Sequence, residues 1–161
     1  MRERLRYTAL ALGAILLIGG VAQATGGSSK GGGSQTLRFL DVSDKFEFVD
    51  VGEPAESESD FGPGDMLIFN NLLRNRADRK ELGSWISICT MTASPGVARC
   101  SGTLGLDQGD IEVATTVDFA DADRIVAAVT GGTGDFQGAG GEVILGDQTN
   151  AGRKLTVKLV R

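Results

Sequence analysis

Apolar and polar residues alternate along most of the chain from Thr36 onward. A period of two residues is typical of β-strands that bury one face, because successive side chains point to opposite sides of a sheet. The pattern predicts eight or nine short strands and hardly one helix. Their expected ranges are 37–42, 46–50, 66–73, 84–92, 97–106, 110–117, 124–130, 142–145 and 153–160.

Turn-forming residues separate several of these segments. Ser94-Pro95-Gly96 and Asp107-Gln108-Gly109 stand where tight hairpins are expected, and residues 146–152 precede the last strand. Residues 75–82 are strongly charged and are expected to form a loop or a single helical turn. Short antiparallel strands joined in this way indicate a β-sandwich or an up-and-down barrel, and the pattern alone does not choose between them.

A dense glycine run extends from Val129 to Glu142 between two apolar segments. A dinucleotide-binding motif counted from Gly132 would need glycine at position 137, which is Gln, and a phosphate-binding loop would need a following Lys-Ser or Lys-Thr. Neither context is present. The run is therefore interpreted as a tight connection between two strands, with backbone at positive φ.

The first 24 residues have the pattern of a secretory signal peptide. Three Arg residues are followed by an apolar run over 8–21 and by Ala22-Gln23-Ala24, which suits a signal peptidase that cleaves after Ala24. The alternative is an uncleaved membrane anchor, although the apolar run is short for a bilayer span. Residues 25–34 are rich in Gly and Ser and read as a flexible spacer, so one domain is expected over 35–161 and the protein is expected to be secreted.

Composition excludes several classes of function. The net charge of −5 disfavours nucleic acid and, after signal cleavage, anionic membranes as partners. The chain has no His, and its one Tyr, Tyr7, lies in the signal segment, so His-dependent nucleophile systems and His-ligated zinc are unavailable. The acidic segments 53–60 and 118–123 lack the spacing of a calcium loop and are interpreted as solvated loops. We expect no metal and no cofactor.

Two cysteines stand at similar distances on either side of the Ser94-Pro95-Gly96 turn. Cys89 and Cys100 are therefore expected to face each other in one hairpin, and in an exported protein they are expected to form a disulfide. The alternative is a free thiol that lines a pocket.

One carboxyl has an unusual position in the pattern. Asp41 shares a predicted strand face with Leu37 and Phe39, so it is expected to point inward. Burial would raise its pKa and suit it to donate a proton or to guide charge. The alternative is that the strand bends or ends here and that the group is solvated.

Three segments together resemble the allene oxide cyclase and dirigent family of small β-barrels. They are Gly64-Asp65-Met66-Leu67-Ile68-Phe69-Asn70-Asn71, Leu82-Gly83 leading to Cys89, and 129–142 with its Thr-Gly-Gly-Thr-Gly-x-Phe-x-Gly-Ala-x-Gly pattern. The resemblance implies a single antiparallel eight-stranded barrel with an apolar cavity, often assembled as a trimer. It also implies a small hydrophobic ligand, which the barrel orients or cyclises.

The resemblance also implies site residues. Asn71 matches an Asn that holds a pocket water in the cyclases, Cys89 matches a pocket cysteine, and Asp41 falls near the acidic pocket residue. Asp41 and Asn71 are therefore the expected catalytic pair, and the family's barrel chemistry rests on excluding water and on holding one conformer. The match is incomplete, because Thr115-Thr116-Val117 stands where the cyclases carry a pocket Tyr and Gly140 stands where the dirigent proteins carry Arg.

Four apolar residues are expected to contact the ligand, namely Phe39, Phe69, Trp85 and Leu104. Trp85, the only Trp, alternates with Ser87 and Cys89 and so lies on the face opposite Ile86 and Ile88. Ile86 and Ile88 are also expected to be inward apolar residues, with Leu67, Leu106, Ile111, Val113 and Val129. These side chains would line either a cavity or a solid core.

Two functions of different classes remain open at this point. The first is a secreted barrel that binds a small hydrophobic molecule and orients or cyclises it. The second is a non-catalytic extracellular module, in which the barrel is only a scaffold and exposed acidic loops bind a partner.

Overall fold

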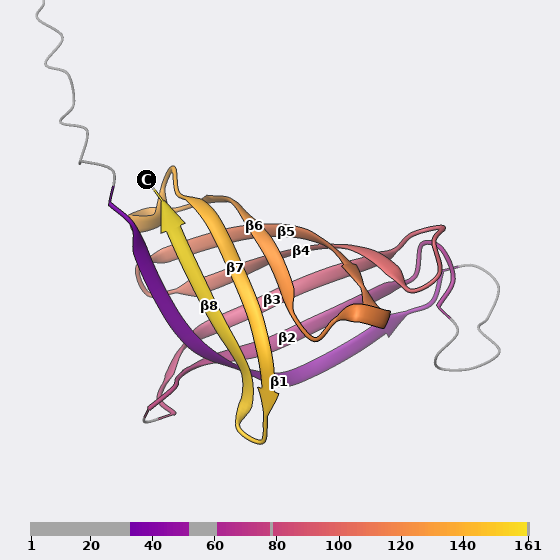
Figure 1. The fold of residues 1–161 in the computed structure, drawn as a ribbon, viewed down its shortest axis with the longest axis horizontal. Coiled ribbons are helices and arrows are strands. Elements are labelled where there is room, and N and C mark those ends of the chain that lie inside the picture. The colour runs from indigo at the N-terminus through magenta and orange to yellow at the C-terminus, as the bar shows by residue number, and fades with distance from the viewer. Residues whose placement is uncertain (1–32, 52–60, 78, 161) are drawn as a thin grey trace, which may run out of the picture.

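The computed structural model describes residues 33–51, 61–77 and 79–160 of the chain. These residues form one closed antiparallel barrel in which every strand pairs with its neighbours in sequence and β1 also pairs with β8 (Figure 1). The predicted barrel is therefore confirmed and the sandwich is excluded. The strands are β1 Gln35–Val49, β2 Met66–Asn75, β3 Glu81–Met91, β4 Val97–Leu106, β5 Gly109–Asp118, β6 Ile125–Gly132, β7 Gly140–Thr149 and β8 Gly152–Val160.

The first two predicted strands are one long strand. β1 runs without a break from Gln35 to Val49, and a register shift between Ser43 and Lys45 marks a β-bulge against β2. A bulge bends a strand while the ladder continues on both sides of it, so the polar residues 43–45 mark a bend rather than a turn. The half of β1 before the bulge pairs with β8 and closes the barrel.

The glycine run forms the connection from β6 to β7, as predicted. It contains a short 3₁₀ turn, η2 (Gly134–Phe136), and its backbone has positive φ at Gly134, Gly138 and Gly141. At Gly141 a Cβ atom would lie 2.0 Å from the carbonyl oxygen of Lys158, so only glycine fits there. The turn places the Phe136 side chain in the larger of two core clusters, where it is 3% exposed.

The core has two parts. The larger cluster includes the fully buried Leu73, Leu104, Ile111 and Leu155, and it also contains Phe136. The smaller one contains Leu67, Cys89, Met91 and Ala98. One cluster therefore includes η2, and the other lies toward the β3–β4 turn.

The outer face corrects one expectation from the sequence. Ile86 and Ile88 are 49% and 41% exposed and point outward, whereas Trp85 and Cys89 on the same strand are buried. Alternation predicts that the two sets lie on opposite faces, but it does not say which face is inside. Prediction of Ile86 and Ile88 as inward residues was wrong.

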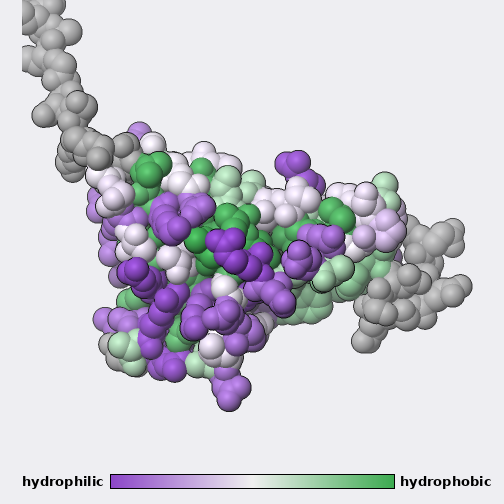
Figure 2. Space-filling view, viewed as in Figure 1, coloured by the Kyte–Doolittle hydropathy of each residue, from purple (hydrophilic) through white to green (hydrophobic). Residues whose placement is uncertain are grey.

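The face formed by β7 and β8 carries many hydrophilic side chains (Figure 2). Two exposed ion pairs lie there, Lys154 with Asp147 and Lys158 with Glu142. In the described ranges the structure has no helix long and apolar enough to cross a membrane. The predicted signal peptide, most of the spacer and the acidic segment 53–60 lie outside the described residues.

Candidate functional site

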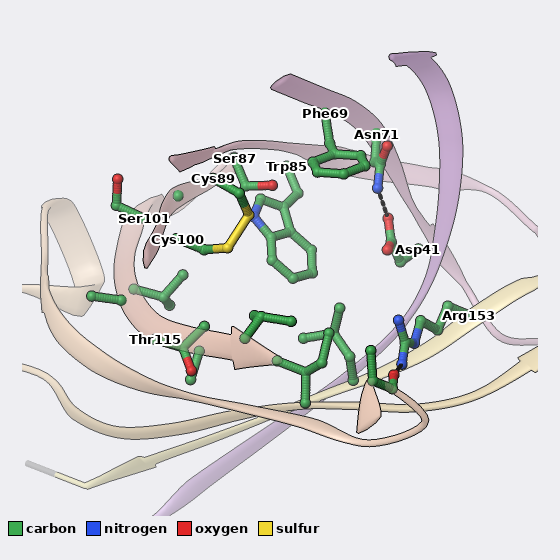
Figure 3. Close-up of a pocket in the computed structure, with 18 of the residues that line it drawn as sticks. Asp41, Phe69, Asn71, Trp85, Ser87, Cys89, Cys100, Ser101, Thr115 and Arg153 are labelled. Carbon is green, nitrogen blue, oxygen red and sulfur yellow. Dashed lines mark hydrogen bonds between the residues drawn. A yellow bond between two sulfur atoms is a disulfide. The ribbon is translucent and has the colours of Figure 1, made fainter. Parts of the chain in front are cut away.

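The barrel contains a cavity of about 340 Å³. Residues of both core clusters contribute to its wall, including Trp85, Val113 and Ala127 from the larger cluster and Cys89 from the smaller one. Most of the wall is apolar or made of small residues, and a few polar side chains point into it (Figure 3). A space of this size and lining suits a small hydrophobic molecule.

The segment between β5 and β6 lies at one side of the cavity. It contains the 3₁₀ turn η1 (Phe119–Asp121), and Phe119, Ala122 and Ile125 all belong to the cavity wall. The Asp118 carboxylate accepts a hydrogen bond from the Ala120 backbone N–H at 2.9 Å, which caps this turn. The sequence of this segment was interpreted only as an acidic loop, so its contribution to the cavity was missed.

Asp41 points into the cavity from β1, as its alternation with Phe39 predicted. It is 8% exposed, and Asn71 Nδ2 donates a hydrogen bond to Asp41 Oδ1 at 2.7 Å (Figure 3). Asn71 reaches it from β2, where it is paired with Ser43, so the contact is a diagonal one across two strands. The structure therefore brings together the two residues predicted to act as a pair.

The surroundings of Asp41 favour its protonated form. Burial raises the pKa of the Asp41 carboxyl, while the hydrogen bond from Asn71 and the positive charge of Arg153 partly offset this effect. The carboxyl therefore keeps its proton to higher pH than a solvated aspartate does. Such a group can donate a hydrogen bond or a proton inside an apolar cavity.

Arg153 is a polar wall residue that the sequence analysis missed. From β8 its guanidinium donates to the carbonyl oxygens of Gly146, Ala122 and Asp123. It thereby joins the β7–β8 hairpin to the segment after η1 and places a positive charge beside the cavity. Sequence pattern gives no sign of this role, since all three acceptors are backbone atoms and two of them lie about thirty residues away in the chain.

Two of the four residues predicted to contact a ligand, Phe69 and Trp85, line the cavity (Figure 3). Phe39 and Leu104 do not. They pack in the larger core cluster, 5% and 0% exposed, and neither belongs to the cavity wall. Alternation marked all four as inward, but it could not separate a wall residue from a core residue.

Cys89 and Cys100 form a disulfide, as predicted, and the alternative of a free thiol is excluded. The two residues are directly opposite each other in the β3–β4 ladder, and both belong to the cavity wall. Ser87, Ser101 and Thr115 contribute to the same wall (Figure 3). Among the described residues, no group of three or more Cys, Asp or Glu side chains is arranged to hold a metal ion.

Comparison with solved structures gives three informative similarities. A pyocyanin demethylase is 26% identical, with a TM-score of 0.65, and the match covers 78% of this chain and 99% of the demethylase. A pterocarpan synthase dirigent protein is 16% identical, with a TM-score of 0.59 over 80% of this chain and 84% of that one. An exo-specific intermolecular Diels-Alderase is 15% identical, with a TM-score of 0.61, and the match covers 80% of this chain and 99% of the Diels-Alderase.

No protein-family model matches the sequence, and a search of curated proteins gives no match. The structural similarities nevertheless agree with the eight-stranded barrel that the sequence resemblance implied. The chain has the eight-stranded barrel fold of the dirigent and allene oxide cyclase-like proteins.

Proposed function

We propose that this dirigent-like barrel is an exported protein that binds a small hydrophobic molecule and orients or cyclises it. The observation that carries the proposal is the apolar cavity with one buried carboxyl, Asp41, held in place by Asn71. A wall of mainly apolar side chains selects hydrophobic ligands. A single fixed polar pair inside it gives the ligand one preferred orientation.

The names of the similar structures support the chemical class. They include dirigent proteins of pterocarpan synthesis, Diels-Alderases and a pyocyanin demethylase, all of which act on small molecules. The Diels-Alderases and dirigent proteins are 14–16% identical to this chain, so they support the barrel as a scaffold for such reactions rather than any one reaction.

The proposed chemistry uses the cavity and Asp41 together. The cavity excludes water and holds one conformer of the ligand, which lowers the entropic part of the barrier to ring closure. In its protonated form, which burial favours, Asp41 can share its proton with a ligand oxygen on which negative charge develops, and it recovers the proton when that charge disappears. Because Asp41 recovers its proton, no net proton transfer is required. Asn71 keeps the carboxyl oriented through its hydrogen bond.

Two features support export of the protein. The Cys89–Cys100 disulfide is stable in oxidising compartments, and the first 24 residues have the pattern of a signal peptide. We propose that the folded barrel works outside the cytoplasm after cleavage behind Ala24.

Native mass spectrometry of protein secreted by its own host tests the binding proposal. Wild-type protein should carry a bound small molecule, or should acquire one from lipid or phenolic extracts. Val113→Phe fills space in the cavity wall and should abolish this binding. Val126→Phe makes the same change on β6, where residue 126 is 38% exposed, and should leave binding intact.

Thermal unfolding followed by circular dichroism checks that both variants are folded. If folded wild-type protein carries no ligand and takes none from either extract, the binding proposal fails and the non-catalytic extracellular module becomes the better interpretation.

If the bound compound is converted, Asp41→Asn should retain binding but slow conversion by roughly a hundredfold or more, which is typical of losing a general acid.

A further inference from the structure

Trp85 carries a buried donor that no described residue of the barrel satisfies. Its side chain is 7% exposed, and its Nε1–H has no hydrogen-bond partner in the part of the chain that the structure describes. Buried indole N–H groups usually find an acceptor, and an exception calls for an explanation such as a ligand. The exception here belongs to a residue of the cavity wall.

The strands around Trp85 explain why the barrel does not satisfy this donor. Trp85 lies opposite Leu104 on β4, and its Nε1 lies over Gly102, where an added Cβ atom would be 2.7 Å away. Leu104 offers no polar side chain and Gly102 offers no side chain at all. Glycine at 102 leaves room for the indole edge, and neither of these two facing residues supplies a side-chain acceptor.

A second unsatisfied polar atom lies on the other side of Trp85. Asn71 is paired with Trp85 across β2 and β3, and its Oδ1 is buried without a partner while its Nδ2 is held by Asp41. Figure 3 shows the indole nitrogen on the ring edge that is farther from Asp41 and Asn71. The cavity therefore has polar groups on two sides of the Trp85 ring.

We propose that Trp85 Nε1–H is the donor that recognises the ligand, and that the cavity selects apolar conjugated molecules carrying a hydrogen-bond acceptor, such as an aryl ketone, enone or quinone. This inference rests on the proposed binding function and narrows its ligand class. A site with a buried unpaired donor discriminates against ligands that leave it unpaired. The flat indole face also suits a flat conjugated ligand.

Two probes of nearly the same shape test the proposal. 9-Fluorenone carries a carbonyl oxygen, whereas fluorene has a methylene group in its place. We expect wild-type protein to bind fluorenone roughly fivefold to tenfold more tightly than fluorene, as measured by calorimetric titration. Trp85→Phe keeps an aromatic ring without the N–H and should reduce this ratio to about one.

Phe69→Leu is the matched control, because it alters another aromatic residue of the same wall but removes no donor. It should weaken both probes and leave their ratio unchanged. A second readout needs no variant. Since the chain has one Trp, its indole N–H gives a single NMR resonance, which should move downfield with fluorenone and not with fluorene.

Equal binding of the two probes, with the same indole resonance in both complexes, would overturn the inference but leave the proposed binding function standing. A ratio that survives in Trp85→Phe would also overturn it, since another group would then be the donor. Absence of binding by both probes, in a protein that also purifies without a ligand, would remove the inference together with the proposed function.

Discussion

Asp41 shows how burial turns an ordinary residue into a candidate acid. Leu37, Phe39 and Asp41 alternate along β1, and this spacing alone predicted an inward carboxyl. The contact with Asn71 could be anticipated only from the family resemblance, because the two residues are thirty positions apart and meet through the β1–β2 register. Arg153 could not be anticipated at all, since its acceptors are backbone atoms of other segments.

The raised pKa of Asp41 predicts a specific dependence of stability on pH. The carboxyl binds its proton more tightly in the folded state, so its contribution to stability is complete below the ordinary aspartate pKa of 3.8 and is lost as pH rises through the higher folded pKa. Asp41→Asn has no proton to lose. The difference in unfolding free energy, wild type minus variant, should therefore fall as pH rises, by about 1.4 kcal/mol for each unit of pKa shift.

Urea unfolding of both proteins between acidic and neutral pH measures this difference. Other carboxyl groups titrate in both proteins, so their effects cancel in the comparison. A difference that stays constant over the whole range would mean that Asp41 is not buried as described.

Arg153 is expected to hold the segment after η1 against the barrel. Arg153→Gln should cost about 1 to 3 kcal/mol of stability, because the carbonyl groups of Ala122, Asp123 and Gly146 lose a charged donor. Amide hydrogen exchange near residues 119–124 should become faster. Lys154→Gln is a suitable control, since the neighbouring Lys154 makes only an exposed ion pair with Asp147 and should cost less than about 1 kcal/mol. Similar exchange in the two variants would contradict the assigned role.

At the scale of the elements, alternation and turn residues predicted most strands, and they failed where the backbone departs from regular geometry. β1 was divided in two because the polar residues at its bulge resemble a turn. The faces of β3 were separated correctly, but Ile86 and Ile88 were placed inside, since alternation defines two faces without naming the buried one. Phe39 and Leu104 were assigned to a ligand site because alternation marks both as inward. It cannot locate the cavity, whose extent depends on all eight strands together.

The β3–β4 hairpin is expected to depend on its disulfide. Replacing both Cys89 and Cys100 with Ala should lower the free energy of unfolding by about 2 to 3 kcal/mol, because the bond closes a short loop in the unfolded chain. Denaturant unfolding of the variant, and of wild-type protein with and without reductant, measures this effect. The reduced wild-type protein should behave like the variant. If mass spectrometry confirms reduction but stability is unchanged, the bond does not constrain the unfolded chain.

At the scale of the whole molecule, the seam between β1 and β8 holds the barrel closed. Leu155 is fully buried and lies opposite Phe39 across this seam. Leu155→Ala should destabilise the barrel by about 2 to 5 kcal/mol, as is typical of a buried Leu. Lys158→Ala on the same strand is the control and should change stability by less than about 1 kcal/mol, because its ion pair with Glu142 is exposed. Chemical denaturation distinguishes the two. Equal effects would mean that the seam is not part of the cooperative core.

The same seam governs the order in which the domain can form. β1 and β8 are the first and last strands, so the barrel cannot close until the final strand is available, and a nascent chain still being synthesised has no partner for the free side of β1. Such a chain has not yet closed its barrel while synthesis continues. Late closure suits the export proposed above, because a chain that has not closed its barrel can still be threaded through a translocation channel.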